Sequence, residues 1–341
     1  MRTKCKGKST VFFADPPRII SGGTIVGDVE AKGPLGSYFD IALEDDTWGE
    51  GTWEKAERKM FEHAVRTALE KGGLTPMQVD ILLGGDLLNQ IISANFAARE
   101  LEIPFLGLYG ACSTMAEGML IGSMLIDGGF ADRVACAASS HFSTAERQYR
   151  LPLEMGSQAV PTSQRTVTGA GCALLSGSGC ADKGSLSNVC IAGGVIGRVV
   201  DLGITDAANM GAAMAPAAAD TLKRHLFDTG RTVEDYDLII TGDLGSFGSE
   251  LFLMLLNDAG IDAGTRHLDC GNIIFSAEQN AVCGGSGCSA VTMNGYILPR
   301  MDAGEYNRIL FMATGALMSP TAGLQGESIP GIAHGVVIER R

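Results

Sequence analysis

The chain has 341 residues, of which 45% are hydrophobic, and a formal net charge of −13. This length allows one large domain or two of ordinary size, with enough apolar residues for a sizeable core. The acidic balance argues against nucleic-acid binding, because phosphate contacts need clustered Lys and Arg side chains and the sequence has no such cluster. No uncharged apolar run approaches the roughly 18 residues that a membrane-spanning helix needs.

The N-terminal segment and the cysteines both indicate a reducing compartment. The apolar stretch at residues 11–14 is too short for a secretory signal peptide, so we expect none. None of the nine cysteines forms a CxxC pair. We therefore expect buried free thiols, and neither disulfides nor a zinc site. The glycine-rich stretch at residues 284–290 lacks the spacing of a dinucleotide-binding loop, so no cofactor is expected.

A long-period internal repeat is the clearest organisational feature. An amphipathic helical pattern and a glycine break precede the segment DILLGGDLLNQ at residues 80–90, and the same succession precedes DLIITGDLGSF at residues 237–247. Each segment has the character of a buried strand that ends in a polar turn. The correspondence continues from residues 110–140 to residues 285–315, where each half has a small-residue helix, a glycine, an arginine and a strand.

The repeat predicts a chain built from two similar α/β halves that pack as one unit, residues 1–190 and residues 191–341. Strands alternate with helices in both halves, which is typical of parallel or mixed sheets covered by helices. The period is too long for a solenoid.

The position of Cys112 in this duplicated pattern resembles the thiolase superfamily, which includes thiolases and ketoacyl-carrier-protein synthases. The cysteine stands in GACSTMAEG, where a buried small-residue helix begins in the first half. The resemblance covers nearly the whole chain and implies the duplicated five-layer α/β/α/β/α fold of that superfamily.

A closer resemblance is to the stage V sporulation protein AD family of spore-forming bacteria. Its blocks run from about Gly33 to Arg340 and include GPLGSYFD, GDLLNQ, IDGGFADRV, SSHFSTAERQYR, GRVVDLGITD, MGAAMAPAAADT and SIPGIAHGVVIER. The resemblance implies a non-enzymatic protein that binds dipicolinic acid, alone or with calcium, during its uptake into the developing spore. It also implies a homodimer on the cytosolic side of the inner spore membrane, held there by membrane proteins of the same sporulation operon.

The residues around Cys112 indicate whether the protein has the groups that acyl transfer requires. A thiol at a helix N-terminus is favoured as thiolate by the helix dipole, which by itself permits acyl transfer. An acyl transferase also needs a base and an oxyanion partner. Of the five histidines, His63 and His225 lie in predicted helices and are most simply interpreted as packing residues. His141 and His267 lie at predicted strand ends, where each could either line a site or form a hydrogen bond with a loop carbonyl.

His334 is the strongest candidate base, because by resemblance its segment takes the place of the second active-site cysteine loop of thiolases. Gly331 stands where that cysteine would be, and Gly242 and Asp243 stand where synthases carry a histidine. Residues 283–290 contain neither His nor Asn at the position of the remaining partner. The missing partners favour binding over catalysis. The alternatives are an acyltransferase that uses Cys112 with His334, and a scaffold whose pocket has no ligand.

A dipicolinate site needs a slot for the ring and donors for two carboxylates. We expect the helix N-terminus at Cys112 and Ser113 to supply N–H groups. Asp86 and Asp243, at equivalent strand ends, would supply oxygen ligands if calcium enters with the ligand, or else cap the following helix. The further candidate donors, with a surface ion pair as the alternative for each arginine, are Asn89, Gln90, His141, Arg165, Arg198 and His334.

Overall fold

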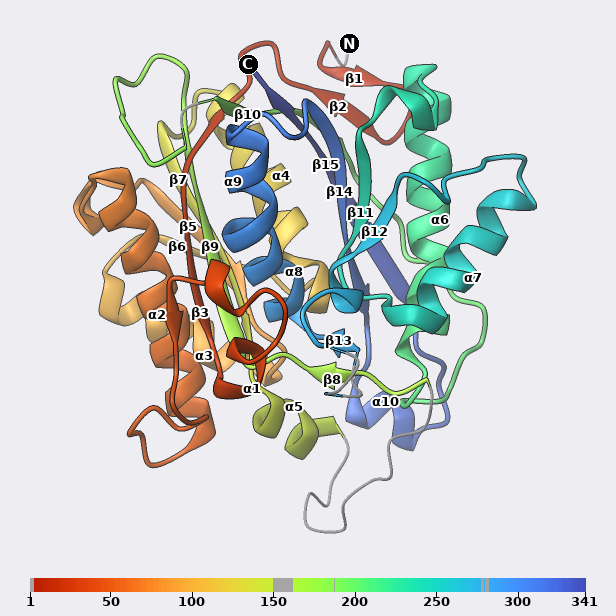
Figure 1. Ribbon diagram of the computed structural model, residues 1–341, viewed down its shortest axis with the longest axis horizontal. Helices are drawn as coiled ribbons and strands as arrows, with labels where there is room; N and C mark the ends of the chain where they lie inside the picture. Colours follow the sequence, from red (N-terminus) through yellow and green to blue (C-terminus); the bar gives the residue numbers. More distant parts are fainter. Residues whose placement is uncertain (1–2, 150–161, 187, 277–278, 280–281) are drawn as a thin grey trace.

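In the computed structural model, which describes residues 3–149, 162–186, 188–276, 279 and 282–341, the chain forms five alternating layers (Figure 1). Helices α2 (Trp53–Gly72) and α3 (Ile92–Leu101) cover the outer face of the first sheet. Helices α6 (Met210–Thr229) and α7 (Gly245–Asn257) cover the outer face of the second. A central helical layer separates the sheets, and the expected α/β/α/β/α fold is confirmed.

The remaining elements of the first half follow the same alternation. They are β1 (Cys5–Lys6), β2 (Thr10–Phe12), β3 (Arg18–Val26), α1 (Asp28–Ala31), β4 (Ile41–Ala42), β5 (Ile81–Gly85), β6 (Phe105–Gly107), α4 (Thr114–Asp127), β7 (Arg133–Ser140), α5 (Phe142–Tyr149), β8 (Arg165–Thr166) and β9 (Gly169–Ser176).

The second half repeats this order from β10 onward. Its remaining elements are β10 (Val189–Val195), β11 (Leu238–Thr241), β12 (His267–Asp269), β13 (Cys283–Gly284), α8 (Ser286–Thr292), the π-helical turn η9 (Met293–Ile297), α9 (Leu298–Asp302), β14 (Arg308–Ala316), α10 (Pro320–Leu324) and β15 (Gly331–Arg340).

The strand order shows the internal symmetry directly. The main path runs β12-β11-β14-β15-β10-β3-β9-β7-β5-β6, so each half contributes five strands in the mirrored succession. In both halves the two outermost pairings are parallel and the two inner ones are antiparallel. The halves meet where β10 pairs with β3 at Cys190 and Arg18. The division at residue 190 remains a prediction.

Equivalent aspartate side chains connect equivalent neighbouring strands in the two halves. The carboxylate of Asp80, just before β5, accepts hydrogen bonds from the N–H groups of Asp132 and Arg133 at 2.8 and 2.9 Å. The carboxylate of Asp237, just before β11, accepts them from Asn307 and Arg308 at 2.6 and 3.0 Å. The repeated aspartates therefore hold the start of each parallel strand pair in register, and the repeat found in the sequence is confirmed.

The long outer helices have clear start and stop signals. The side chain of Thr52 caps α2 by accepting from Lys55 N–H, and that of Asn209 caps α6 by accepting from Ala212 N–H. Each helix ends at a glycine with a left-handed backbone, Gly73 after α2 and Gly230 after α6. Such a glycine ends a helix without the steric cost that other residues have there.

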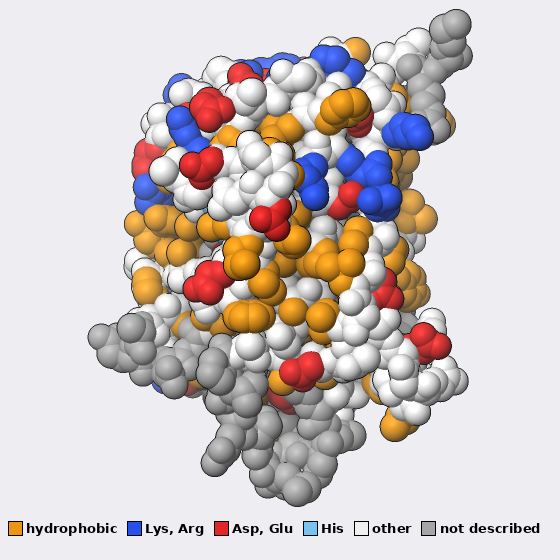
Figure 2. Space-filling view, turned by 90° about the vertical axis from the view of Figure 1, so that its right-hand side faces the viewer, with side chains coloured by type: hydrophobic (Ala, Val, Ile, Leu, Met, Phe, Trp, Pro, Cys, Tyr) orange, Lys and Arg blue, Asp and Glu red, His pale blue; other side chains and the backbone are white. Residues whose placement is uncertain are grey.

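Helices α6 and α7 approach each other closely because both have a glycine at the crossing. A Cβ atom built on Gly248 would lie 2.8 Å from Gly211 Cα, and one built on Gly211 would lie 2.9 Å from Gly248 Cα. Helix α7 is apolar on its outward side too, where Phe247 and Met254 are 37% and 61% exposed. The face where α6 and α7 lie shows an apolar band across its middle (Figure 2).

The expectation of no disulfide is wrong. Cys283 and Cys288 form a disulfide with their Cα atoms 6.4 Å apart. The chain turns between them at Gly285, whose φ of +95° favours glycine, and this turn brings the two cysteines together. The other seven cysteines are free, and five of those are buried, as expected. None of the helices among the described residues is long and apolar enough to cross a membrane.

Candidate functional site

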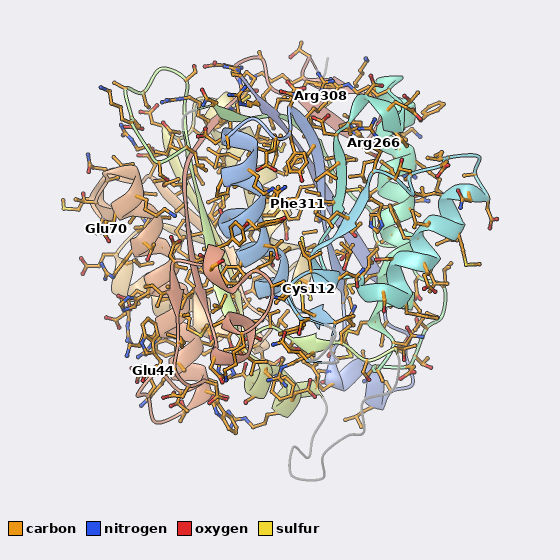
Figure 3. All side chains as sticks on the ribbon, in the orientation of Figure 1. Glu44, Glu70, Cys112, Arg266, Arg308 and Phe311 are labelled. Atoms are coloured by element: carbon orange, nitrogen blue, oxygen red, sulfur yellow. A yellow bond between two sulfur atoms is a disulfide. The ribbon has the colours of Figure 1, made fainter. Side chains whose placement is uncertain are left out.

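A pocket opens beside Cys112, between the central helical layer and the ends of strands from both halves. Figure 3 places Cys112 in the middle of the molecule, between the two sheets. The pocket has a cavity volume of about 40 Å³, which is room for a few water molecules. Its described lining residues are Leu87, Ala111, Cys112, Ala145, Glu146, Tyr149, Gln164, Thr166, Met210, Asp243, Gly284, Gly285, Ala316 and Met318.

Cys112 lies in the short 3-10 turn η4 (Ala111–Ser113) that leads into α4. The turn is entered through Ala111, whose φ of +50° is unusual for a residue other than glycine. Ser113 is fully buried, and both its N–H and its hydroxyl donate to the carbonyl of Gly110, at 3.0 and 2.7 Å. Ser113 is not among the residues that line the pocket, so Cys112 is the member of this predicted pair that faces it.

Asp243 brings a carboxyl group to the pocket from the second half. It follows β11 and is 1% exposed. One of its oxygens accepts from the Thr314 hydroxyl at 2.7 Å, and the other accepts from Gly285 N–H at 2.9 Å. Burial raises the pKa of this carboxyl to about 6, partly opposed by its hydrogen bonds with Thr314 and with the Cys112 thiol.

The Cys112 thiol is a poor nucleophile in this setting. Burial raises its pKa well above the ordinary value of 9.0, and the negative charge of Asp243 and the hydrogen bond to that carboxylate raise it further. The thiolate is the nucleophilic form of cysteine, and an acyl transferase promotes it with a neighbouring imidazole or another positive group. Among the described lining residues there is no histidine, lysine or arginine. The site therefore keeps Cys112 protonated.

The two histidines predicted for the site have structural partners instead. His334 on β15 accepts from Gly197 N–H at 3.2 Å, and burial lowers its pKa to about 4. Nε2 of His141 donates to the carbonyl of Asp46 at 2.7 Å, and its Nδ1 accepts from Ser143 N–H at 3.1 Å. Neither histidine is among the described residues that line the pocket.

Asp86 and Asn89 lie in the turn after β5 and serve that turn. Both Asp86 carboxylate oxygens accept hydrogen bonds from backbone N–H groups, those of Leu88 and Ala94, at 2.8 Å each. This aspartate therefore caps the following helix α3, which was the predicted alternative to calcium binding. Asn89 is exposed and donates its N–H to the side chain of Gln148 at 2.9 Å. Leu87, between them, is the residue of this turn that reaches the pocket.

The two candidate arginines also have other contacts. Arg198 is exposed and forms a bidentate ion pair with Asp220 at 2.9 and 2.7 Å. Arg165 lies over the ring of Phe142, with its guanidinium carbon 4.0 Å from the ring centre. Neither is among the described residues that line the pocket.

Several lining residues were not found from the sequence. Gln164 is buried, lies on the pocket wall and donates from Nε2 to the carbonyl of Asp243 at 2.7 Å. Thr166 lies on the same wall, two residues further along. The available signal was strand alternation around Arg165, because residues on either side of a strand position face the opposite way from it. Tyr149, Met210 and Met318 are apolar or aromatic residues with no chemical pattern to mark them.

The fold is shared with condensing and thiolytic enzymes of known structure. The structure of 3-oxoacyl-acyl-carrier-protein synthase III from Aquifex aeolicus VF5 matches with a TM-score of 0.59 and 15% identity, over 95% of this chain and 100% of that one. Human mitochondrial 3-ketoacyl-CoA thiolase matches with a TM-score of 0.58 and 12% identity, over 96% and 99%. At these identities the similarity shows a thiolase-like fold.

Sequence comparison is more specific. The family model for stage V sporulation protein AD matches residues 7–339. Stage V sporulation protein AD of Bacillus subtilis (strain 168) is 48% identical over 339 residues, which cover 99% of this chain and 98% of that protein. The chain therefore belongs to the stage V sporulation protein AD family, a sporulation family with a thiolase-like fold.

Proposed function

We propose that this protein binds dipicolinic acid, alone or as its calcium complex, in the pocket beside Cys112, and takes part in dipicolinate uptake into the developing spore without catalysing acyl transfer. Membership of the sporulation family supports the biological setting. The observation that carries the molecular proposal is the pocket itself. The pocket lies beside the cysteine at the start of the central helix, as expected for a thiolase-like fold. An acyl transferase would need a base beside this cysteine, but the neighbouring group is Asp243, which keeps Cys112 in its thiol form.

The lining suits a small, flat ligand with polar edges. Tyr149, Met210 and Met318 provide aromatic and apolar walls, while Gln164 and Thr166 provide an amide and a hydroxyl group. The cavity of about 40 Å³ leaves little free space beside Cys112, so we expect side chains to adjust as the ligand enters. Methionine side chains adapt readily to such changes because they are unbranched and flexible.

Calcium fits the proposal through the acidic residues of the wall. Asp243 and Glu146 both line the pocket, and Ca²⁺ prefers carboxylate and carbonyl oxygens. The calcium ion of such a complex would present positive charge to these carboxyl groups and offset the charge of the dipicolinate. No group of three or more His, Cys, Asp or Glu side chains that could hold a metal occurs among the described residues, so the ligand would supply further coordinating atoms.

The acyltransferase alternative requires Cys112 and His334 to work together. His334 already accepts a hydrogen bond from Gly197 N–H and has its pKa lowered by burial. His334 is also not among the described residues that line the pocket. Both observations support binding over transfer.

We also propose partners and a cellular location for the protein. We propose a homodimer that lies on the cytosolic side of the inner spore membrane, held by membrane proteins of the same sporulation operon. The exposed apolar residues of α7, within the face shown in Figure 2, support docking of another protein. An apolar surface that persists across a helix of a globular protein is typical of a protein contact.

Calorimetric titration of dipicolinate, with and without calcium, tests the proposal. The wild-type protein should bind saturably, and Cys112→Trp should bind at least about a hundredfold more weakly, because an indole group fills the cavity. Cys180→Trp is the matched control, since Cys180 is partly exposed and does not line the pocket.

Equal binding by wild type and Cys112→Trp would place the ligand elsewhere. No saturable heat at millimolar ligand, for a wild-type protein that is folded by circular dichroism, would overturn dipicolinate binding altogether. It would leave acyl transfer and scaffolding as the alternatives.

A further inference from the structure

The two strand-end aspartates occupy equivalent positions in the two halves but have different tasks. Asp86 follows β5 and Asp243 follows β11. The Asp86 carboxylate caps its own turn, where it accepts from the N–H groups of Leu88 and Ala94. The Asp243 carboxylate instead accepts from Thr314, on β14, and from Gly285, before α8. Asp243 is thus available to the pocket, whereas Asp86 is not.

The turn after β11 still has N–H groups that need an acceptor, and Asp269 supplies it. Asp269 ends the neighbouring strand β12 and is 2% exposed. Its Oδ2 accepts from Leu244 N–H at 2.9 Å, and its Oδ1 accepts from Gly245 N–H at 2.9 Å. Leu244 and Gly245 directly follow Asp243. They belong to the turn that Asp243 would cap if it acted as Asp86 does in the first half.

Two further hydrogen bonds fix Asp269. The Thr241 hydroxyl donates to Oδ2 at 2.6 Å, and Gly271 N–H donates to Oδ1 at 2.9 Å. Thr241 is the last residue of β11, so the carboxylate of Asp269 connects the end of that strand with the start of α7. Four donors converge on one buried carboxylate, which is a rigid arrangement because an unsatisfied buried N–H group is costly.

We propose that Asp269 is the positioning residue of the pocket: it caps the turn at residues 241–245 in place of Asp243, and thereby frees the Asp243 carboxylate to face Cys112 and the ligand. The inference rests on the proposed ligand site. Without Asp269, the N–H groups of Leu244 and Gly245 lose their acceptor. The nearest carboxylate able to replace it is that of Asp243, which would turn back onto its own turn as Asp86 does.

The test compares Asp269→Asn with Asp237→Asn. The first substitution places an NH₂ group against a backbone N–H at the pocket end of β11. The second removes charge from an aspartate that accepts two backbone N–H groups at the opposite end of the same strand. Affinity for calcium dipicolinate should fall about tenfold or more in Asp269→Asn, the order expected for a charged group that contacts the calcium ion, and remain close to wild type in Asp237→Asn.

A second readout does not depend on the ligand. Asp243 raises the pKa of the Cys112 thiol, so the pH–rate profile of Cys112 alkylation by iodoacetamide, followed by mass spectrometry, reports where that carboxylate lies. In Asp269→Asn the profile should shift to lower pH, and in Asp237→Asn it should not. A residue that only stabilises the fold would leave this profile unchanged in the folded protein.

Wild-type affinity together with an unshifted alkylation profile in folded Asp269→Asn would overturn the inference. If wild type itself does not bind dipicolinate, the proposed function fails, while the alkylation profile still decides the role of Asp269. Should Asp269→Asn fail to fold, Thr241→Val removes a single hydrogen bond to Asp269 and must shift the profile in the same direction; no shift in that variant would also overturn the inference.

Discussion

Glu57 is a buried carboxyl group of the first half that forms no ion pair among the described residues. It lies on α2, where its oxygens accept from the hydroxyl groups of Ser139 and Thr144 at 3.1 and 2.8 Å. Burial raises its pKa to about 8, and the negative charge of Asp86 raises it as well. The folded protein therefore binds a proton at Glu57 near neutral pH, where the unfolded chain does not.

This proton makes stability depend on pH in a defined direction. Between the ordinary pKa of 4.5 and the native value of about 8, the folded state binds more protons than the unfolded state, so the free energy of unfolding falls as pH rises. Glu57→Gln stays neutral and escapes this loss. Relative to wild type it should gain roughly 4 kcal/mol on going from pH 4.5 to pH 8, measured by urea unfolding.

Glu70→Gln is the control, because it changes an exposed carboxyl group on the same helix, at the outer edge of the molecule (Figure 3). Its stability should follow the pH dependence of wild type. A parallel decline of wild type and Glu57→Gln between pH 4.5 and pH 8 would show that Glu57 releases its proton in the folded protein.

At the residue scale, the sequence predicted the pocket only where chemistry and position coincide. Cys112 and Asp243 were found because each stands at a repeated element boundary and carries a reactive or charged group. Arg165 was chosen for its charge, but its neighbours Gln164 and Thr166 line the pocket because strand alternation turns them the other way. The partners of Arg198 and His334 are distant in sequence, so no local pattern identified their structural tasks.

At the scale of elements, α6 and α7 can cross closely because both have a glycine, which has no side chain, at the crossing point. Gly248→Ala would place a methyl group 2.8 Å from Gly211 Cα, which is backbone and moves only if the helices separate. We expect a loss of about 2 kcal/mol in the free energy of unfolding, and a lower melting temperature by calorimetry.

Gly323→Ala is a suitable comparison, because a Cβ atom at that position of α10 has nothing within 4 Å. It should melt close to wild type. A Gly248→Ala protein that melts with wild type would mean that the two helices separate at little cost.

The sequence predicted elements where a periodic pattern is repeated, and failed where geometry depends on a single torsion. The repeated aspartate and apolar runs predicted β5 and β11, which the structure confirms. The disulfide between Cys283 and Cys288 was missed because the left-handed turn at Gly285 is specified by no periodicity.

At the scale of the whole molecule, the central helical layer belongs to both halves. Helix α4 comes from the first half and packs against β7 and β9 of its own sheet and against β14 and β15 of the other. Residues 1–190 alone would leave one side of this apolar helix exposed. We therefore expect neither 1–190 nor 191–341 to fold by itself, whereas co-expression should give a folded pair, measured by circular dichroism and size-exclusion chromatography.

A matched comparison uses the intact chain under the same conditions. A cooperative thermal transition in residues 1–190 alone, with the circular dichroism of a folded α/β protein, would contradict this expectation. It would mean that each half is an independent folding unit despite the shared layer.

The position of β15 has a consequence for synthesis. These last strand residues, Gly331–Arg340, lie between β14 and β10 in the middle of the combined sheet (Figure 1). Both of its neighbours come earlier in the chain, so β10 and β14 wait for their common neighbour while the residues before β15 are made. The second half therefore completes its sheet only once β15 has been made, and until then its apolar strands depend on other protection against aggregation.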